Sequence, residues 1–332
     1  MNACLPGDRT LLHLIQPISE LLGDSDVTDI VVNKPCQVGV RRSGKWQFIH
    51  SPSFDFDTLD AATILIGQRT GREFDEANPY VNSTLPGGQR FQGVRPPGTK
   101  PGRILWAIRR PPAVARKLDD PDFDDLTSEV NTDMARRQIS AFSVATAFKN
   151  KDWREVFIRS RLAGLSIGFC GAMGDGKSDM VRRTMQVSRP ESRMLTVETD
   201  DECGDTGPEN KAPLYYDDLK INSDEAVRIA KRLVPDDIIM QEVRGPEAWS
   251  LLVMMNAGVS GLTTWHSDEG KEHEALAEMA RSHTAVRDMK DEVLLEKAGN
   301  AFDVIAYCRR NTEKKFRISS IRLMAAEREM KQ

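Results

Sequence analysis

No apolar run in this sequence approaches the ~20 residues that a helix needs to cross a bilayer. The first residues also lack the basic and then apolar layout of a secretory signal. We therefore expect a cytoplasmic protein without an intrinsic transmembrane segment.

Cysteine is scarce, and its pattern disfavours two kinds of structure. The five cysteines are scattered and odd in number, which is typical of reduced thiols rather than of a disulfide framework. No C-x-x-C pair occurs, so a structural zinc site is not expected. Basic residues are not in excess either, because 46 Lys plus Arg face 50 Asp plus Glu, for a formal net charge of -4. No global basic surface therefore indicates nucleic-acid binding.

The length of 332 residues and the hydrophobic content of 39% predict two domains. Between residues 116 and 131 the apolar periodicity stops, and six acidic residues gather around Pro121. We interpret this stretch as part of a linker between the domains. The predicted domains are an N-terminal domain over residues 1–112, an acidic linker with a connecting helix over 113–150, and a second domain over 151–332.

The first domain is predicted to be a small α+β domain. Apolar residues at helical spacing indicate a helix over residues 11–22, which Pro17 should interrupt, and a second helix over 57–69. Ser43-Gly44 has the composition of a two-residue hairpin turn. The strand-like runs are residues 27–33, 38–42 and 45–49, and the segment 82–110 returns to strands at 89–94 and 103–108. This segment carries five arginines, which either line a solvated face or reach a phosphate ligand: Arg90, Arg95, Arg103, Arg109 and Arg110.

The second domain contains the motif G-x-x-x-x-G-K-[ST] of a phosphate-binding P-loop over residues 171–178. A strand-like run at 165–170 precedes the motif and a helical run at 178–187 follows it, which is the context that the motif requires. Lys177 is expected to reach the β- and γ-phosphates of ATP, and the Ser178 hydroxyl to bind Mg²⁺. The residues expected around the phosphates are Gly171, Gly174, Asp175, Gly176, Lys177, Ser178 and Asp179.

Strands and helices alternate after the P-loop, which predicts a mainly parallel sheet covered on both faces. Predicted strands end at Glu198, at Glu242 and just before His266, whereas residues 199–213 are predicted to form a loop. Because ligands bind at the carboxyl edge of such sheets, we expect these three side chains near the P-loop.

ATP hydrolysis needs an oriented water, a metal and stabilising positive charge. One of Glu198 and Glu242 could polarise the water while the other supports the Mg²⁺ shell. His266 could sense the γ-phosphate or cap the following turn, and Arg244 is a further electrostatic candidate.

At these residues the sequence resembles the traffic ATPases of bacterial type IV secretion and plasmid conjugation, within the secretion ATPase superfamily. Residues 195–202, 236–249 and 256–266 look like the acidic box, the Walker B segment and the histidine box of that family. In the N-terminal half, residues 30–35, 85–90 and 108–111 match as well. The resemblance covers nearly the whole chain and implies a RecA-like P-loop domain preceded by a smaller α+β domain.

The resemblance implies a homo-hexameric ring that hydrolyses ATP with Mg²⁺ at the cytoplasmic face of the inner membrane. Such a ring would be held there by secretion or conjugation components, including other ATPases, and protein or DNA would be its cargo. By this resemblance Glu198 is the acidic-box glutamate, and Glu242 is the Walker B glutamate that supports Mg²⁺ indirectly. His266 is the histidine-box residue, and Arg90 and Arg109 contact the nucleotide.

The P-loop and its surroundings depart from the pattern of the family. Asp175 and Asp179 stand where the family has neutral residues, Thr199 replaces an aspartate of the acidic box, and Gln241 replaces a small residue. Both departures in the P-loop add negative charge near a triphosphate. The sequence is therefore compatible with weak ATP turnover as well as with full activity.

Three alternatives remain from the sequence. A motor of type II secretion or of type IV pili is disfavoured, because type II motors carry paired C-x-x-C motifs and this sequence has none. A weakly active, nucleotide-binding ring subunit would work by docking partners. A small-molecule kinase is disfavoured by the acidic and histidine boxes.

Overall fold

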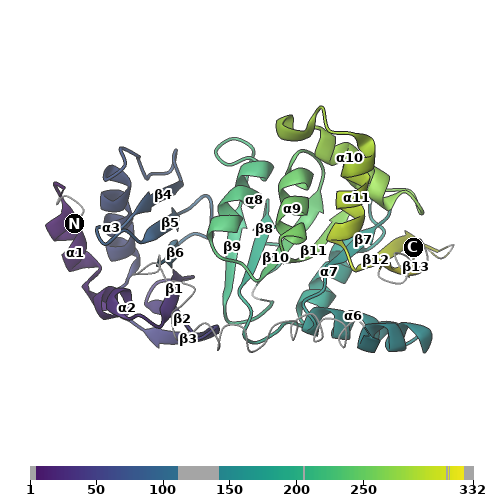
Figure 1. Ribbon diagram of the computed structural model, residues 1–332, viewed down its shortest axis with the longest axis horizontal. Coiled ribbons are helices and arrows are strands. Elements are labelled where there is room, and N and C mark those ends of the chain that lie inside the picture. Colours follow the sequence, from purple (N-terminus) through teal and green to yellow (C-terminus); the bar gives the residue numbers. More distant parts are fainter. Residues whose placement is uncertain (1–4, 111–141, 205, 312, 314, 325–332) are drawn as a thin grey trace, which may run out of the picture. The chain divides into compact units, whose positions relative to one another are not determined.

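The computed structural model describes residues 5–110, 142–204, 206–311, 313 and 315–324. The chain divides into two compact units. The colours of Figure 1 follow the sequence, so each stretch of a unit can be found by its residue numbers. The first unit comprises Met1–Ala113, Arg193–Glu202 and Glu209–Pro235. The second unit comprises Val114–Ser192, Cys203–Pro208 and Asp236–Gln332. Most of the predicted linker lies outside the described residues, and the predicted domain boundaries stay predictions.

An antiparallel sheet of six strands forms the centre of the first unit, in the order β3-β2-β1-β6-β5-β4. Its strands are β1 (Val27–Val32), β2 (Gln37–Arg42), β3 (Lys45–His50), β4 (Tyr80–Thr84), β5 (Arg90–Val94) and β6 (Leu105–Arg109). Ser43 and Gly44 both have positive φ, which matches the twist of a tight β2–β3 hairpin. The strands and the hairpin turn predicted for this region are therefore confirmed.

The helices of the first unit are α1 (Asp8–Leu14), η1 (Gln16–Ile18), α2 (Ser19–Gly23) and α3 (Phe56–Gln68). Pro17 lies in η1 and separates α1 from α2, as predicted. Asp55 caps α3 by accepting a hydrogen bond from the Thr58 backbone N–H at 2.8 Å. In the core, the Trp106 indole donates to the Thr63 hydroxyl at 2.7 Å, so this large buried ring leaves no polar atom unpaired.

Three later elements also belong to the first unit: β8 (Met194–Glu198), β9 (Lys211–Tyr215) and α8 (Ser223–Arg232). The prediction that residues 199–213 form a loop was wrong at its end, because β9 pairs in parallel with β8. Pro213 disguised this strand, since proline has no N–H and usually occurs only in edge strands. Its carbonyl oxygen accepts from the Thr99 hydroxyl at 2.7 Å, and the Tyr215 N–H donates to the Gly98 carbonyl at 2.9 Å.

The strands of the second unit are ordered β13-β12-β7-β11-β10, with all neighbours parallel except the antiparallel pair β12–β13. They are β7 (Ile167–Cys170), β10 (Asp237–Val243), β11 (Ser260–Trp265), β12 (Val304–Arg310) and β13 (Phe316–Leu323). β7 and β11 are buried at every residue, which is typical of central parallel strands. The mainly parallel sheet predicted for this part of the chain is confirmed.

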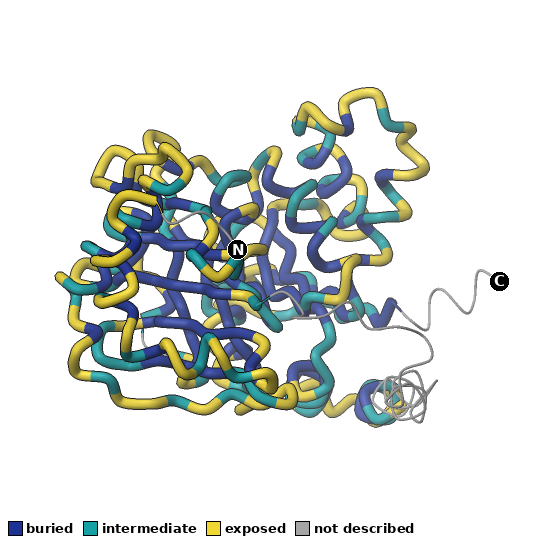
Figure 2. The backbone as a smooth tube through the Cα atoms, turned by 60° about the vertical axis from the view of Figure 1, so that its left-hand side comes forward, coloured by how far each residue is buried: buried dark blue, intermediate teal, exposed yellow. Residues whose placement is uncertain are grey.

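The helices of the second unit are α6 (Trp153–Leu162), α7 (Lys177–Met185), α9 (Glu247–Asn256), α10 (Glu272–Arg281), η2 (Thr284–Val286) and α11 (Asp291–Ala301). α9, α10 and α11 contact one another, whereas α7 contacts β7, β10, β11 and α6. Figure 2 shows the buried strands and the exposed outer turns of the helices. Among the described residues, no helix combines the length and the apolar character that crossing a bilayer requires.

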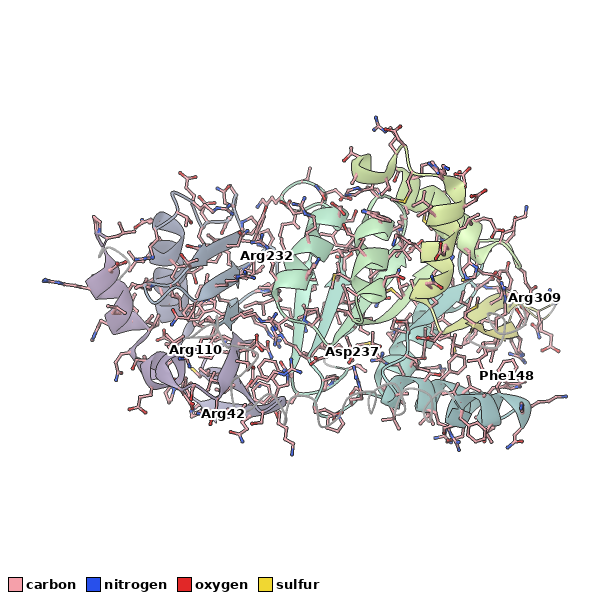
Figure 3. The ribbon with its side chains drawn as sticks, in the orientation of Figure 1. Arg42, Arg110, Phe148, Arg232, Asp237 and Arg309 are labelled. Carbon is pink, nitrogen blue, oxygen red and sulfur yellow. The ribbon has the colours of Figure 1, made fainter. Side chains whose placement is uncertain are left out.

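A buried ion pair lies at the start of β10. The Asp237 carboxylate, labelled in Figure 3, is 3.3 Å from the Arg161 guanidinium of α6 and 3.2 Å from that of Arg189. Arg161 and Asp237 are almost completely buried. If one partner were removed, the charge of the other could not be stabilised by water instead. This pair fixes α6, which leads into the P-loop strand, to the strand that carries Glu242.

Replacing Asp237 with alanine should destabilise the protein by about 3–5 kcal/mol, because it leaves a buried guanidinium charge uncompensated. The measurement is the free energy of unfolding in urea. Asp291→Ala is the matched control, since Asp291 pairs with Arg281 at the surface, where an ion pair contributes about 1 kcal/mol or less. Equal stability losses in the two variants would contradict this account of the β10 ion pair.

Candidate nucleotide site

The P-loop connects β7 to α7, so the strand and the helix predicted around the motif are confirmed. Gly171 and Gly176 have positive φ values of 139° and 86°. A Cβ on Gly171 would lie 2.1 Å from the Cys308 carbonyl oxygen, and one on Gly176 would lie 2.6 Å from the Phe316 ring. Only glycine fits at these two positions, because the β12–β13 hairpin lies directly behind the loop.

Lys177 is the first residue of α7, and its side chain is buried inside the P-loop. Its ammonium group donates hydrogen bonds to the carbonyl oxygens of Gly171 at 3.0 Å and Ala172 at 2.8 Å. The third neighbour is Nδ1 of His266, at 3.2 Å. Burial lowers the pKa of Lys177, while the nearby carboxylates of Glu242 and Asp175 act in the opposite direction. The lysine is therefore held in place by acceptors that a phosphate could replace.

Glu242 and His266 extend this set of contacts from the ends of β10 and β11. Nε2 of His266 is 2.8 Å from one Glu242 carboxylate oxygen, and the Arg244 guanidinium is 2.6 Å from the other. Burial raises the pKa of Glu242, but the Arg244 hydrogen bond and the charges of Arg244 and Lys177 oppose that effect, so the pKa lies below its ordinary value. The Glu242 carboxylate is thus kept ionised at neutral pH.

Nδ1 of His266 lies 3.2 Å from the Lys177 ammonium and 3.1 Å from the Gly171 carbonyl oxygen, so its role as donor or acceptor depends on the tautomer. If Nε2 carries the proton and donates it to Glu242, the lone pair of Nδ1 is available to accept from Lys177. Lys177, His266, Glu242 and Arg244 then form a continuous chain of alternating donors and acceptors. A change of proton position or charge at one end of this series of hydrogen bonds would alter the strength of the bonds at the other end.

The segment that carries Arg244 is anchored by a residue that the sequence analysis did not single out. The carboxylate of Glu247, in the first turn of α9, accepts from the Arg244 N–H at 2.6 Å and from the Gly245 N–H at 2.9 Å. On the other side, the Thr264 hydroxyl donates to the Gln241 carbonyl at 2.7 Å. A glutamate at a helix start is a common capping signal, so Glu247 could have been found from sequence.

The two unusual acids of the P-loop are held differently. The Asp175 carboxylate folds back into the loop and accepts from the Ala172 N–H at 3.1 Å. Asp179 lies in the first turn of α7 and forms an ion pair with Arg183 at 2.6 Å along the helix surface. Asp175 therefore occupies a backbone N–H of the loop itself, whereas Asp179 is neutralised by a neighbour on its own helix.

Arg310 is a second residue that sequence analysis missed. It lies at the end of β12 and donates to the Gly174 carbonyl oxygen at 2.8 Å, so it holds the P-loop from behind. In the sequence it stands beside Arg309 and Asn311, a polar run without a motif. Only the fold places it beside the loop, since 136 residues separate it from Gly174.

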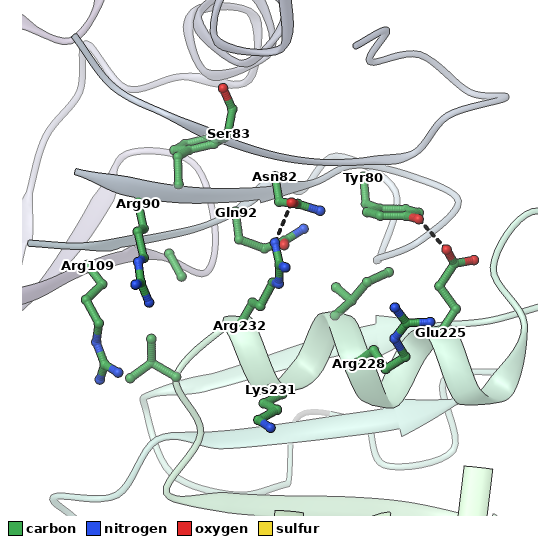
Figure 4. A pocket seen from close by; sticks show the side chains of 14 residues that line it. Tyr80, Asn82, Ser83, Arg90, Gln92, Arg109, Glu225, Arg228, Lys231 and Arg232 are labelled. Carbon is green, nitrogen blue, oxygen red and sulfur yellow. Dashed lines mark hydrogen bonds between the residues drawn. The ribbon is translucent and has the colours of Figure 1, made fainter. Parts of the chain in front are cut away.

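Three predicted site residues belong to the first unit. Glu198 ends β8 and is buried, and its carbonyl oxygen accepts from the Tyr216 N–H at 3.0 Å. Arg90 begins β5 and Arg109 ends β6, and both line a cavity of about 860 Å³ within this unit (Figure 4). The structure thus brings Lys177, His266, Glu242 and Arg244 together in one unit, and Arg90 and Arg109 together in the other.

The donors of the second unit suit a nucleotide phosphate chain. The first N–H groups of α7 have no partners within the helix, and they point out of its positive N-terminal end. The buried ammonium of Lys177 and the half-buried hydroxyl of Ser178 stand at the same helix start. Mg²⁺ in nucleotide sites is typically held by substrate phosphates and one or two protein oxygens, for which Ser178 and Glu242 are the candidates here.

Comparison with known proteins gave similarities along nearly the whole chain. No family model matches. The type IV secretion system protein VirB11 of Bartonella quintana is 26% identical over 328 residues, which cover 94% of this chain and 92% of the relative. Protein VirB11 of Agrobacterium tumefaciens is 26% identical over 308 residues, which cover 90% and 89%.

One solved structure supports the same fold. The crystal structure of the VirB11 ATPase from the Brucella suis type IV secretion system, in complex with sulphate, matches with a TM-score of 0.88. The match covers 96% of each chain at 22% sequence identity. The fold class predicted from the sequence, a P-loop α/β domain preceded by a smaller α+β domain, is confirmed.

Proposed function

We propose that this chain, which resembles the VirB11 traffic ATPases of type IV secretion, hydrolyses ATP as a motor of a secretion or conjugation apparatus. The observation that carries the proposal is the chain of contacts from Lys177 of the P-loop through His266 to Glu242 and Arg244. The similarity to VirB11 proteins over at least 90% of this chain also supports the proposal.

In this proposal the residues of the second unit bind and polarise the substrate. The N–H groups of the P-loop and the Lys177 ammonium hold the β- and γ-phosphates, and the Ser178 hydroxyl holds Mg²⁺. Bound Mg²⁺ supplies neutralising charge on the phosphate oxygens. When a phosphate oxygen replaces the loop carbonyls as the partner of Lys177, the contact between Lys177 and His266 changes as well.

Glu242 is proposed to orient and polarise the attacking water. Its carboxylate is kept ionised by Arg244 and His266, which also fix its two oxygens in direction. His266 contacts Lys177 through Nδ1 and Glu242 through Nε2, so phosphate binding at Lys177 would change the hydrogen bond that His266 makes with Glu242. Arg244 would add positive charge where the transition state is negative. The resemblance alone supports a role of Glu198 in the Mg²⁺ shell and of Arg90 and Arg109 in contacting the nucleotide.

At the level of the assembly, we propose a homo-hexamer that works in the cytoplasm, attached to the inner membrane through secretion or conjugation components. ATP turnover would move the N-terminal domains as rigid bodies, since residues between Leu11 and Ile108 form one buried core. Such motion would drive assembly of the apparatus or transfer of protein or DNA cargo.

The hexamer can be tested by measuring mass and turnover together. Sedimentation of the native chain, with and without MgATP, should show a species of six chains. ATPase activity per chain should rise with protein concentration over the range in which that species forms, because the active unit is the ring. Constant activity per chain in a preparation that stays monomeric would overturn the hexameric motor.

A second candidate is a ring subunit that binds nucleotide weakly and acts by docking partners. The contact between Asp175 and the Ala172 N–H favours it, because a carboxylate occupies part of the phosphate cradle. Its negative charge would also repel the incoming triphosphate.

Replacing Asp175 with serine should therefore raise ATP affinity roughly tenfold, a change of about 1.4 kcal/mol. Serine can still accept from the Ala172 N–H but carries no charge. The measurement is the dissociation constant of ATP by calorimetry. Asp179→Thr is the matched control and should change affinity less, since Arg183 already neutralises Asp179. Unchanged or weakened binding in Asp175→Ser would show that this carboxylate does not obstruct the loop.

A further inference from the structure

A cavity of about 860 Å³ lies in the first unit, between the β4–β6 part of the sheet and helix α8 (Figure 4). We call it the α8 cavity. Arg90 and Arg109 reach it from the sheet, and Arg228 and Arg232 from α8, where they stand one turn apart. All of its lining residues belong to the first unit, and none of them is part of the P-loop.

Positive charge dominates this cavity. Five basic side chains line it, namely Arg90, Arg109, Arg228, Lys231 and Arg232. Among the described residues that line it, Glu225 is the only carboxylate, and it already accepts a hydrogen bond from the Tyr80 hydroxyl. Burial and the contact with Glu225 raise the pKa of Tyr80 to about 12, so the phenol stays neutral and adds no negative charge.

Most of these cations have no counter-charge. Among the residues that the structure describes, Arg90, Arg228 and Lys231 form no ion pair, and Arg232 bonds only to the neutral Asn82 amide oxygen. Arg109 is the exception, because it pairs with Asp29 at 2.9 Å. Like charges gathered in one cavity repel each other, and an anion bound among them would relieve that repulsion.

Gln92 provides an independent sign of a ligand. Its side chain lies in the wall of the cavity and is only 2% exposed, yet its amide oxygen has no hydrogen-bond partner. An unpaired buried polar atom destabilises the protein unless something bonds to it. The amide can accept from a ligand hydroxyl or, rotated by half a turn, donate to a ligand oxygen.

We propose that the α8 cavity is a binding site for a small molecule that carries two or more phosphates. Guanidinium groups form paired hydrogen bonds with phosphate oxygens, and four of the five cations here are arginines. The volume lies within the range of about 300–1,000 Å³ that is common for small-molecule sites. Arg232 of α8 lies opposite Gln92 and Asn82 of the sheet, and Arg228 lies further along the helix near Glu225, as Figure 4 shows.

This site goes beyond the proposed ATPase function. The resemblance assigns Arg90 and Arg109 to the nucleotide of the P-loop, but it assigns no role to α8. Because Arg228 and Arg232 are exposed, they can be replaced without disturbing the buried core. A second phosphate site can therefore be separated from the P-loop by mutation.

The test measures binding in a full-length Lys177→Ala chain, in which the P-loop site is disabled. Calorimetry with inorganic pyrophosphate and with ATP should each show one site per chain. Arg228→Ala or Arg232→Ala, added to that chain, should weaken binding by at least tenfold, and Arg232→Lys by less, because lysine keeps the charge but loses the paired geometry. Lys220→Ala is the control, since this exposed lysine of the same unit lies outside the cavity.

The outcomes separate the proposal from its competitors. Binding of both probes would identify phosphate as the recognised group, whereas binding of ATP alone would identify a nucleotide; both support the site if the arginine variants weaken it. The proposal is overturned if the Lys177→Ala chain binds neither probe. It is also overturned if Lys220→Ala weakens binding as much as Arg232→Ala does, or if the chain binds only single-stranded DNA.

Discussion

Lys177→Ala should reduce the rate of ATP hydrolysis by a factor of about 10²–10³ or more. The ammonium group is the only buried lysine nitrogen described inside the P-loop, and its present acceptors are the loop carbonyls that a phosphate would displace. Its removal takes away the positive charge that the transition state needs. The measurement is steady-state phosphate release at saturating MgATP.

A control variant must separate this loss from a general effect of removing a lysine. Lys149→Ala removes an exposed lysine of the same unit and should keep the native rate. Thermal unfolding of both variants checks that the fold is intact. A Lys177→Ala protein that is folded and hydrolyses ATP within twofold of the native rate would remove the P-loop from the mechanism.

Glu242→Gln should reduce turnover by about 10²–10⁴ while leaving ATP affinity within a few-fold of native. The amide keeps the shape of the side chain but cannot polarise a water, and it no longer attracts Arg244 or a protonated His266. In the proposed mechanism substrate binding depends mainly on the P-loop, whose residues this change leaves in place. Single-turnover hydrolysis and a separate ATP titration give the two quantities.

Two further variants make this result specific. Glu278→Gln removes an exposed carboxylate of α10 and should have no effect on turnover. Glu198→Gln tests the alternative assignment, in which the acidic-box glutamate polarises the water. If Glu198→Gln abolishes turnover and Glu242→Gln only halves it, the roles that we propose for the two glutamates are exchanged.

The sequence predicted the parts of the site that follow from local pattern. The P-loop has a fixed spacing, and Glu242 and His266 stand at the ends of strands that hydrophobic runs reveal. Because β10 and β11 are parallel neighbours, their carboxyl ends had to meet at one edge. The contact between the two side chains, at 2.8 Å, follows directly from that arrangement.

Other features had no local signal. β9 was hidden because Pro213 interrupts the pattern of a strand, and its pairing with β8 is visible only in the fold. Arg310 supports the P-loop from a strand that lies more than a hundred residues further along the chain. The sequence identified Asp175 as unusual, but the direction of its side chain depends on the loop geometry that places the Ala172 N–H within reach.

The α8 cavity of the first unit also could not be predicted from local sequence patterns. The arginines of its last strands were recognised as candidates for a phosphate ligand. That Arg90 and Arg109 share a cavity with Arg228 and Arg232 depends on the packing of α8 against a sheet from a distant part of the sequence. Helical spacing alone would place the α8 arginines on an ordinary solvated face.

The central claim is that Lys177, His266 and Glu242 form one catalytic unit for ATP hydrolysis. The most direct measurement is phosphate release by the native chain at saturating MgATP, run beside Lys177→Ala and Glu242→Gln. The account predicts sustained turnover by the native chain and rates at or near background for both variants. A native chain that binds ATP but releases phosphate no faster than the two variants would contradict it.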